Sequence, residues 1–487
     1  MSKGRVCLAY SGGLDTSTIL VWLLQQGYQV VCYLGDVGQD EDFAAVEAKA
    51  LKLGAEAFVC ENLQRELVDD VVSRAIMCNA IFEDQYLLGT ALARPIIARS
   101  MIRVAEKHNC AYLSHGATGK GYECGTLTLS LARFDSRLVT ARDFIRPDLA
   151  FIALNPSIQI LAPWRMPEFI EKFQSAQLKS AFAINTMGLT LIPQGPQRPS
   201  QIRCREQHSR LINTQGTMDP SVYSFFRLLT YIAQNIIHTS YEAGILEDPD
   251  HTPPKELWMR TKDPQDAPNE PTEFSVHFEK GDFSLISKVV VGDKEVTDSV
   301  ESLKLLNKAS FAACYCSIGY ENGVGRVDIV ENRFIGLKSR GIYDNAQLTP
   351  GLTLARLAHL SLEGLVMDGR VRELRDQFSS ITWSRLIYNG MYFSPEREFV
   401  ENSVVFCQHN VTGVVRLSAY KGHAYVLGRS SNASNLYSEQ DASMDSLEGF
   451  SPMEYLPSTT GFIAIQAIRL KKYGEQKIKD GQPLSKS

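Results

Sequence analysis

The strongest constraint on the fold is a glycine loop near the N-terminus, set between an apolar run and a helical pattern. Residues 6–10 form the apolar run and residues 11–17 the loop; residues 18–26 carry an apolar stripe before Gly27, which is placed to end a helix. Further strands are expected at residues 30–34, 57–60, 111–114 and 158–162, and helices at residues 42–53, 65–77 and 91–107. Repeated strand–helix units of this length predict an α/β fold with a parallel, doubly wound sheet and helices on both faces.

The pattern changes after about residue 173. Proline-bearing polar stretches then alternate with amphipathic strands, as at residues 274–278 and 289–291, and an amphipathic helix is expected at residues 461–476. Three parts are therefore expected. They are a nucleotide-binding domain at 1–175, an α+β domain at 176–460, and a C-terminal oligomerisation helix and tail at 461–487.

The composition is that of a globular enzyme acting on small molecules. A chain of 487 residues, 44% of them hydrophobic, can bury two or three cores. Its 50 basic and 55 acidic residues give a net charge of -5, which lacks the strong basic bias typical of nucleic-acid binding. Small-molecule substrates are expected, and no nucleic-acid partner.

Cysteine usage and hydropathy indicate the cytoplasm. The 10 cysteines are scattered, mostly in apolar runs, and the single C-x-C of Cys314 and Cys316 has no second pair or nearby His. We expect incidental thiols and no metal site made of side chains. The N-terminus runs directly into the first strand, and no stretch approaches the ~18 apolar residues of a membrane span.

The residues of the first loop suit a polyphosphate. Successive N–H groups of a Ser-Gly-Gly turn form an anion-binding nest, and the following helix N-terminus adds a positive dipole. Ser11, Thr16 and Ser17 supply hydroxyl donors, while Asp15 could orient the loop or contact a hydrated Mg²⁺. The spacing is not that of a Walker loop. The alternative is a plain strand-to-helix turn capped by Asp15 or Ser17.

The string SGGLDTS resembles the pyrophosphate loop (PP-loop) of the ATP pyrophosphatase superfamily, which splits ATP into AMP and pyrophosphate to adenylate an oxygen. Six segments together resemble one family within it, the argininosuccinate synthases: residues 9–17, 86–95, 114–121, 162–169, 240–247 and 323–343. The resemblance implies a carbon–nitrogen ligase of arginine biosynthesis that uses ATP with Mg²⁺ and is a homotetramer. It would join citrulline to aspartate through a citrullyl-adenylate.

The resemblance also implies the site residues. Those for ATP are Ala9, Tyr10, Ser11, Gly12, Gly13, Leu14, Asp15, Thr16, Ser17, Gly35 and Gly116. Those for citrulline are Tyr86, Thr90, Arg146, Ser240, Glu331 and Tyr343, and those for aspartate are Thr118 and Asp143. Arg146 would take the citrulline carboxylate and Glu331 the ammonium. As alternatives, Tyr86 and Tyr343 could be core aromatics, and Glu331 could cap an element or pair with Arg333 or Arg340.

Two stretches depart from the family pattern. An insert at about 122–141 interrupts the second glycine loop. The family has an Asn directly after this loop, and here that position is held by Tyr122 or Arg142. Another insert lies at about 200–234. The Ser that the family places after YLLGT is Ala91. Both inserts are apolar and mixed rather than Gly/Ser-rich, and one interpretation is that they include translated introns.

These departures leave two functions open. The first is the ligase, and the second is a catalytically impaired paralogue that binds nucleotide or partner proteins. The intact first loop favours the ligase, whereas the interrupted second loop favours the paralogue. A tRNA-modifying member of the superfamily is disfavoured by the acidic balance.

Overall fold

The computed structural model describes most of the chain outside the two inserts. The described residues are 2–117, 146–170, 231–237, 239–242, 244–258, 260–279, 286–307, 318–333, 336–344, 350–437 and 459–481. Thr118, Asp143 and the insert at 122–141 lie outside them. The insert at 200–234 also lies outside, except for its last residues, 231–234, which form a strand.

The N-terminal part is a five-stranded parallel sheet, as the sequence predicts. Its strands are β1 (Arg5–Ala9), β2 (Gln29–Asp36), β3 (Ala57–Asn62), β4 (Tyr112–Ser114) and β5 (Gln159–Leu161), in the order β3-β2-β1-β4-β5. The flanking helices are α1 (Leu14–Gln25), α2 (Phe43–Lys52), α5 (Gly89–Lys107) and α7 (Arg146–Leu154). A 3₁₀ turn, η3 (Pro163–Arg165), follows β5.

Alternating side chains of β1 explain why helices cover both faces. Val6 and Leu8 lie in a core with residues of α1 and α2, whereas Cys7 lies in a separate core with residues of α5 and α7. A strand buried on both faces reads as a continuous apolar run, which is why this part of the fold is visible in the sequence.

The strand order places two loops at one crevice. The chain passes from β1 outward to β2 and β3, then returns to β4 on the other side of β1. The carboxyl ends of β1 and β4 therefore flank the point where the order reverses, which is where open α/β sheets bind ligands. Both glycine loops begin there.

The predicted helix at 65–77 is helical but not one regular α-helix. It consists of α3 (Gln64–Glu66), a π-helix η1 (Leu67–Val72) and α4 (Ser73–Met77). Leu67, Val68, Val71 and Val72 are all buried, so this segment is surrounded by other elements. It packs on the second part of the molecule, and one continuous apolar core extends across that contact.

The second part is α+β, with two antiparallel sheets. One has the order β10-β9-β8-β13-β14, formed by β8 (Thr272–Phe278), β9 (Ile286–Val291), β10 (Lys294–Val296), β13 (Gly413–Tyr420) and β14 (His423–Ser430). The other has the order β11-β12-β7-β6, formed by β6 (Tyr231–Gln234), β7 (Thr239–Glu242), β11 (Arg326–Asn332) and β12 (Lys338–Asp344).

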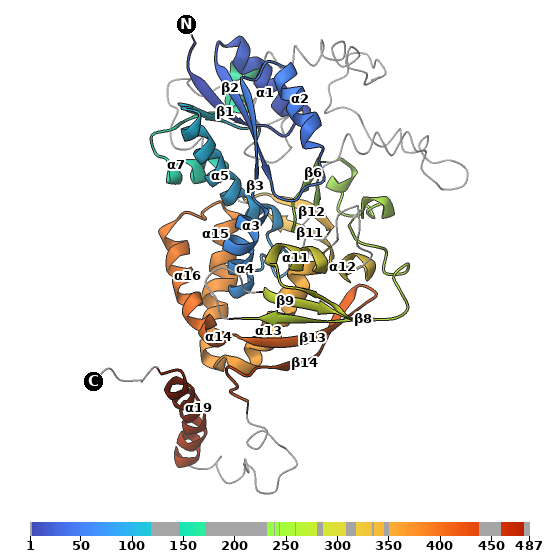
Figure 1. Ribbon diagram of the computed structural model, residues 1–487, viewed down its shortest axis with the longest axis vertical. Coiled ribbons are helices and arrows are strands. Elements are labelled where there is room, and N and C mark those ends of the chain that lie inside the picture. The colour runs from blue at the N-terminus through green and yellow to red at the C-terminus, as the bar shows by residue number, and fades with distance from the viewer. Residues whose placement is uncertain are drawn as a thin grey trace.

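Helices pack against the first of these sheets (Figure 1). The helices described in this part are α11 (Ser299–Leu306), α12 (Ile318–Glu321), α13 (Pro350–Val366), α14 (Gly369–Arg375), π-helix η8 (Asp376–Trp383), α15 (Ser384–Tyr388) and α16 (Pro395–Cys407). Short 3₁₀ turns are η6 (Gly244–Glu247), η7 (Lys255–Leu257) and η9 (Gln408–Asn410). The C-terminal helix α19 (Thr459–Lys479) extends beyond the body of the molecule (Figure 1).

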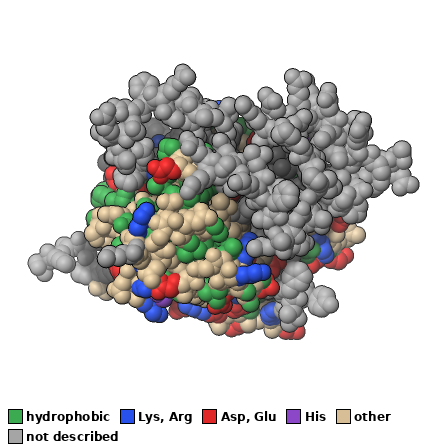
Figure 2. Space-filling view, turned by 90° about the horizontal axis from the view of Figure 1, so that it is seen from above, with side chains coloured by type: hydrophobic (Ala, Val, Ile, Leu, Met, Phe, Trp, Pro, Cys, Tyr) green, Lys and Arg blue, Asp and Glu red, His purple; other side chains and the backbone are tan. Residues whose placement is uncertain are grey.

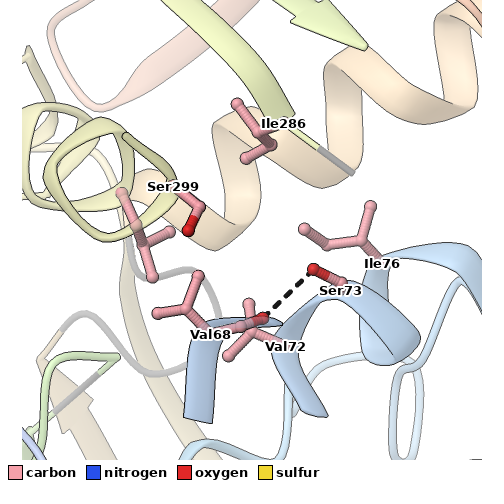
Figure 3. Close-up of a pocket in the computed structure, with 7 residues that line it drawn as sticks. Val68, Val72, Ser73, Ile76, Ile286 and Ser299 are labelled. Atoms are coloured by element: carbon pink, nitrogen blue, oxygen red, sulfur yellow. Dashed lines mark hydrogen bonds between the residues drawn. The ribbon is translucent and has the colours of Figure 1, made fainter. Parts of the chain in front are cut away.

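A small cavity of about 10 Å³ lies where the two parts meet (Figure 3). Its lining is mostly apolar and comes from η1, α4, β9 and α11. The two lining serines have partners: Ser73 Oγ donates to the Val68 carbonyl at 3.1 Å, and Ser299 Oγ donates to Asp69 at 2.6 Å. The cavity is therefore a packing void with room for at most about one water.

The distribution of surface charge and the hydropathy of the helices bear on nucleic-acid and membrane binding. In the view from the side of the parallel sheet, basic and acidic side chains are interspersed on the described surface (Figure 2). Among the described helices, none combines the length and apolar character needed to cross a bilayer.

Candidate functional site

The first loop leaves the start of α1 open to a ligand. The N-cap of α1 is Gly13, which has no side-chain acceptor for the first-turn amides. Four helices have a side-chain cap, since Asp42, Asp298, Asp368 and Ser394 cap α2, α11, α14 and α16, whereas α5, like α1, has none. A helix start without a side-chain cap, together with the helix dipole, suits a polyphosphate.

Gly12 shapes this loop. Its φ of +73° is one that side chains rarely adopt, and an added Cβ would lie 3.0 Å from Cγ2 of Val46 in α2. Lys49 of α2 donates to the Gly12 carbonyl at 2.6 Å, and burial lowers the pKa of Lys49. A lysine 37 residues downstream thus fixes the loop, a contact that the sequence motif does not reveal.

The loop hydroxyls are also ordered. Tyr10 Oη and Ser17 Oγ lie 3.1 Å apart, and Ser11 Oγ lies 3.3 Å from Thr16 Oγ1. Thr16 Oγ1 is also within 3.4 Å of the Gly13 carbonyl. These contacts hold the hydroxyl-bearing side chains of the motif close together at the carboxyl end of β1.

Gly35 and Gly116 flank the same edge of the sheet. Gly35 lies near the end of β2, where a Cβ would come within 2.8 Å of Leu63 Cδ1, so the main chain is tightly approached. A Cβ on Gly116 would lie 3.3 Å from Thr16 Cγ2. The second loop therefore contacts the first, and the structure brings the two glycine loops together.

A buried histidine and aspartate join the ends of the second loop. His115 Nε2 lies 2.8 Å from Asp148 Oδ1, and Arg165 donates to Asp148 Oδ2 at 2.8 Å. Ala117 N donates to His115 Nδ1 at 3.2 Å, so the ring donates to Asp148 through Nε2. Since Asp148 belongs to the helix that Arg146 begins, the stretches before and after the insert at 122–141 are held in contact.

Three of the residues expected to bind citrulline, Ser240, Glu331 and Tyr343, lie on one face of the second antiparallel sheet; with Tyr86 they form what we call the citrulline-type cluster. Cross-strand partners share a face, and Glu331 pairs with Ser339, whereas Tyr343 pairs with Ser240. Tyr343 also stacks on Tyr86, with ring centroids 4.5 Å apart and an interplanar angle of 11°. Segments separated by about 250 residues are thereby brought side by side.

Tyr86 links this group to the start of α5. The amide N–H of Thr90 donates to Tyr86 Oη at 3.2 Å. Burial, with Glu331 nearby, raises the pKa of Tyr86 to about 12, so its hydroxyl remains protonated at neutral pH. Tyr86 and Tyr343 are both buried, as core aromatics would be, and they also lie beside a buried carboxylate.

Glu331 is the most unusual group of this cluster. Its side chain is 0% exposed, and its Oε2 accepts no hydrogen bond within the described part of the chain. Its partner is Arg333, at 3.2 Å, whereas Arg340 pairs with Asp328 at 2.7 Å. Burial raises the pKa of Glu331, although the charge of Arg333 and two tyrosine hydroxyls act in the opposite direction.

The sequence motifs did not single out three further residues of this cluster. Tyr388 donates to Glu331 Oε1 at 3.1 Å and stacks on Phe82 with centroids 3.9 Å apart. Glu242 lies 2.8 Å from Arg333. Gly341 has no room for a Cβ, which would lie 2.5 Å from Tyr343 Oη. Only the alternation of β7, β11 and β12 could have placed Glu242 and Gly341 on the face of Glu331.

Three expected residues cannot be placed by their side chains. Thr118 and Asp143 lie outside the described residues, and Arg146 is known only as the first residue of α7. Within the described ranges, no group of three His, Cys, Asp or Glu side chains could hold a metal ion. The arrangement offers an anion site at α1 and a buried carboxylate with a free oxygen, which suits binding and orientation of charged substrates.

Comparison with known proteins identifies the family. The family model described as "Arginosuccinate synthase N-terminal HUP domain" matches residues 5–140, and "Arginosuccinate synthase C-terminal domain" matches residues 231–473. The chain is 44% identical to the argininosuccinate synthase of Saccharomyces cerevisiae, with 100% of each chain covered. It is also 44% identical to that of Schizosaccharomyces pombe, over 97% of this chain and 98% of the relative. The Homo sapiens enzyme is 40% identical over 97% of both chains. The chain therefore belongs to the argininosuccinate synthase family.

Proposed function

We propose that this protein ligates citrulline to aspartate with ATP, releasing AMP and pyrophosphate. In the first step the citrulline ureido oxygen attacks the α-phosphorus of ATP and pyrophosphate leaves. In the second the aspartate amine attacks the ureido carbon of the citrullyl-adenylate and AMP leaves. Membership of the family supports this reaction. The observation that carries it is the buried Glu331 beside Tyr343 and Tyr388: its Oε2 has no hydrogen-bond partner among the described residues, and the same chain has a helix α1 that starts without a side-chain cap.

Each substrate has its own set of groups in this proposal. The residues at 9–17 would hold the pyrophosphate, and Gly35 and Gly116, at the same edge of the sheet, would contact the nucleotide through the main chain. Citrulline would contact Tyr86, Thr90, Arg146, Ser240, Glu331 and Tyr343. Aspartate would contact Thr118 and Asp143. Because both steps displace good leaving groups, positioning and charge neutralisation would supply most of the catalysis.

Mg²⁺ is proposed as the metal that accompanies ATP. Mg²⁺ keeps several waters and binds polyphosphate oxygens, so a dedicated cage of side chains is not needed. Asp15 lies in the first turn of α1, where it could hold one of those waters. When bound, the ion would neutralise charge on the polyphosphate. Titrating EDTA against activity, with and without added MgCl₂, tests this requirement.

Oligomerisation, location and domain limits are also proposals. Exposed apolar side chains on α14, η8 and α16, namely Leu374, Phe378, Ile381, Phe399 and Phe406, support assembly into a homotetramer. The unpaired thiols of the described cysteines support a reducing, cytoplasmic location. We propose domain limits at 1–175, 176–460 and 461–487, as the sequence predicts. Sedimentation of the wild type and of Phe399→Asp tests the assembly, since loss of an interface lowers the mass.

The reaction is tested with purified protein, ATP, citrulline and aspartate. We expect pyrophosphate and argininosuccinate in equal amounts. Pyrophosphate that requires citrulline, with no argininosuccinate, would mean that only adenylation occurs. No pyrophosphate at all, from a folded protein, would favour the impaired paralogue.

The same assay tests the role of Glu331. Glu331→Gln removes the charge that would bind the citrulline ammonium, so the KM for citrulline should rise about 10- to 100-fold, with the KM for ATP unchanged. Asp328→Asn is the matched control. It lies on the other face of β11 and pairs with Arg340, away from Glu331.

A further inference from the structure

Arg333 lies between two carboxylates at the edge of the citrulline-type cluster. Its Nη1 is 3.2 Å from Glu331 Oε1, and its Nη2 is 2.8 Å from Glu242 Oε2. Its Nε donates to Ser339 Oγ. The guanidinium is thus held at three of its nitrogens by residues of β7, β11 and β12, and its side chain is 16% exposed.

Arg333 and Tyr388 meet at the same oxygen of Glu331. Oε1 is approached by Arg333 and accepts from Tyr388 Oη at 3.1 Å. Oε2 is buried and accepts no hydrogen bond from any described residue. A buried carboxylate normally has both oxygens satisfied, so the free oxygen suits a donor that the protein itself does not supply.

The net charge of Glu331, Glu242 and Arg333 together favours a cationic donor. Two carboxylates, Glu331 and Glu242, share one guanidinium, which leaves a net charge of about -1 in a place sheltered from water. Tyr343, Tyr388 and Tyr86 also face Glu331, and Arg94 acts on Tyr86. The tyrosines are neutral at neutral pH.

Arg333 opposes the effect of burial on Glu331. Burial alone favours the protonated acid, which cannot attract an ammonium. Arg333 is the largest influence in the opposite direction, and the paired carboxylates raise the pKa of Arg333 so that it stays charged. Without this guanidinium, Glu331 would take up a proton at a higher pH.

We propose that Arg333, anchored by Glu242, is a positioning residue that keeps Glu331 ionised and leaves its Oε2 as the acceptor for the citrulline ammonium. This inference rests on the proposed function, because it takes citrulline to be the ligand of Glu331. Arg333 acts through Glu331 and does not itself touch the substrate.

The test measures citrulline binding by calorimetry and the KM values for citrulline and ATP, between pH 6 and pH 9. The variants are Arg333→Gln, Arg333→Lys and Glu242→Gln. Arg340→Gln is the matched control, since it breaks an arginine–carboxylate pair on the opposite face of the same hairpin. Thermal unfolding of every variant checks that the fold is kept.

Arg333→Gln should weaken citrulline binding about tenfold or more at pH 7.5. The loss should be larger at lower pH. Without Arg333, Glu331 takes up its proton at a higher pH, so the pH below which citrulline affinity falls is also higher. Arg333→Lys should restore the positive charge but not the contacts with both Glu331 and Glu242, and so recover part of the affinity. Glu242→Gln should give a smaller loss, while the KM for ATP and the Arg340→Gln profile stay at wild-type values.

Two outcomes would overturn the inference. One is an Arg333→Gln protein that is folded and keeps the wild-type citrulline profile while Glu331→Gln loses affinity; the role of Glu331 then stands and only the role of Arg333 fails. The other is equal loss for citrulline and ATP in both Arg333→Gln and Arg340→Gln, which marks a structural effect. If neither the wild type nor any variant binds citrulline, both the inference and the proposed function are wrong.

Discussion

Substituting Gly341 by Ala should impair citrulline use by displacing Tyr343. An added Cβ would lie 2.5 Å from Tyr343 Oη and 2.6 Å from its Cζ. Ordinary contacts begin at about 3.5 Å, so the ring must move by about 1 Å. It cannot do so freely, because Tyr343 is buried and stacks on Tyr86 at 4.5 Å.

Two effects should follow from this displacement. Overpacking should lower the free energy of unfolding by about 1–3 kcal/mol. A reacting group misplaced by ~1 Å can cost ~100-fold in rate, so kcat/KM for citrulline should fall by about two orders of magnitude. The KM for ATP should stay within about twofold, because Gly341 lies on the antiparallel sheet and the phosphate loop on the parallel one.

The assay follows pyrophosphate release while citrulline is varied at saturating ATP and aspartate, with thermal unfolding in parallel. Gly369→Ala serves as the control, since a Cβ there meets nothing within 4 Å. A folded Gly341→Ala protein with wild-type kcat/KM for citrulline would refute the reasoning, because it would show that Tyr343 does not need its present position.

Three further predictions concern stability and are measured by urea unfolding, with the exposed pair partner Glu373→Gln as a control expected to change it by less than about 0.5 kcal/mol. Asp148→Asn removes the carboxylate shared by His115 and Arg165, so a loss of about 2–3 kcal/mol is expected; wild-type stability would contradict the bridge across the second loop. Glu363→Gln breaks a fully buried pair with Arg375, at 2.5 Å on both oxygens, and should cost about 3–5 kcal/mol. Because the pKa of Glu363 is lowered in the fold, mainly by His359 and Arg375 against burial, this difference should be full above about pH 4.3 and shrink as the pH falls further; a difference that grows in acid would reverse that sign. Leu303→Ala enlarges the cavity of Figure 3 and should cost about 2–5 kcal/mol, whereas a cost below about 1 kcal/mol would mean that the site collapses around it.

The helical stretch at 64–77 shows where local pattern was insufficient. Its apolar residues predict a helix, and the chain is helical there. The π-helical register of residues 67–72 was not predicted, because it depends on packing against α5 and α11 rather than on the order of the side chains. The strand at residues 231–234 is similar, since pairing with β7 places it in a sheet.

The pairing of Glu331 shows the same limit at the site. Arg333 and Arg340 are both near it in sequence, and the sequence left both open as partners. The register of the β11–β12 hairpin decides between them: Glu331 lies opposite Ser339, so Arg340 points to the other face and pairs with Asp328. Tyr388 comes from a helix 57 residues further along the chain, and no spacing rule connects it to Glu331.

The sequence by itself determined the parallel sheet, the glycine loop and the family resemblance. Continuous apolar runs, loop glycines and helix ends are local signals that neighbouring residues specify. Only the tertiary structure decided that Lys49 fixes the loop, that His115 and Asp148 join the ends of the interrupted segment, and that Oε2 of Glu331 has no partner in the part of the chain that the structure describes. Those contacts depend on strand register and on packing between distant segments, which the energies of the whole fold select.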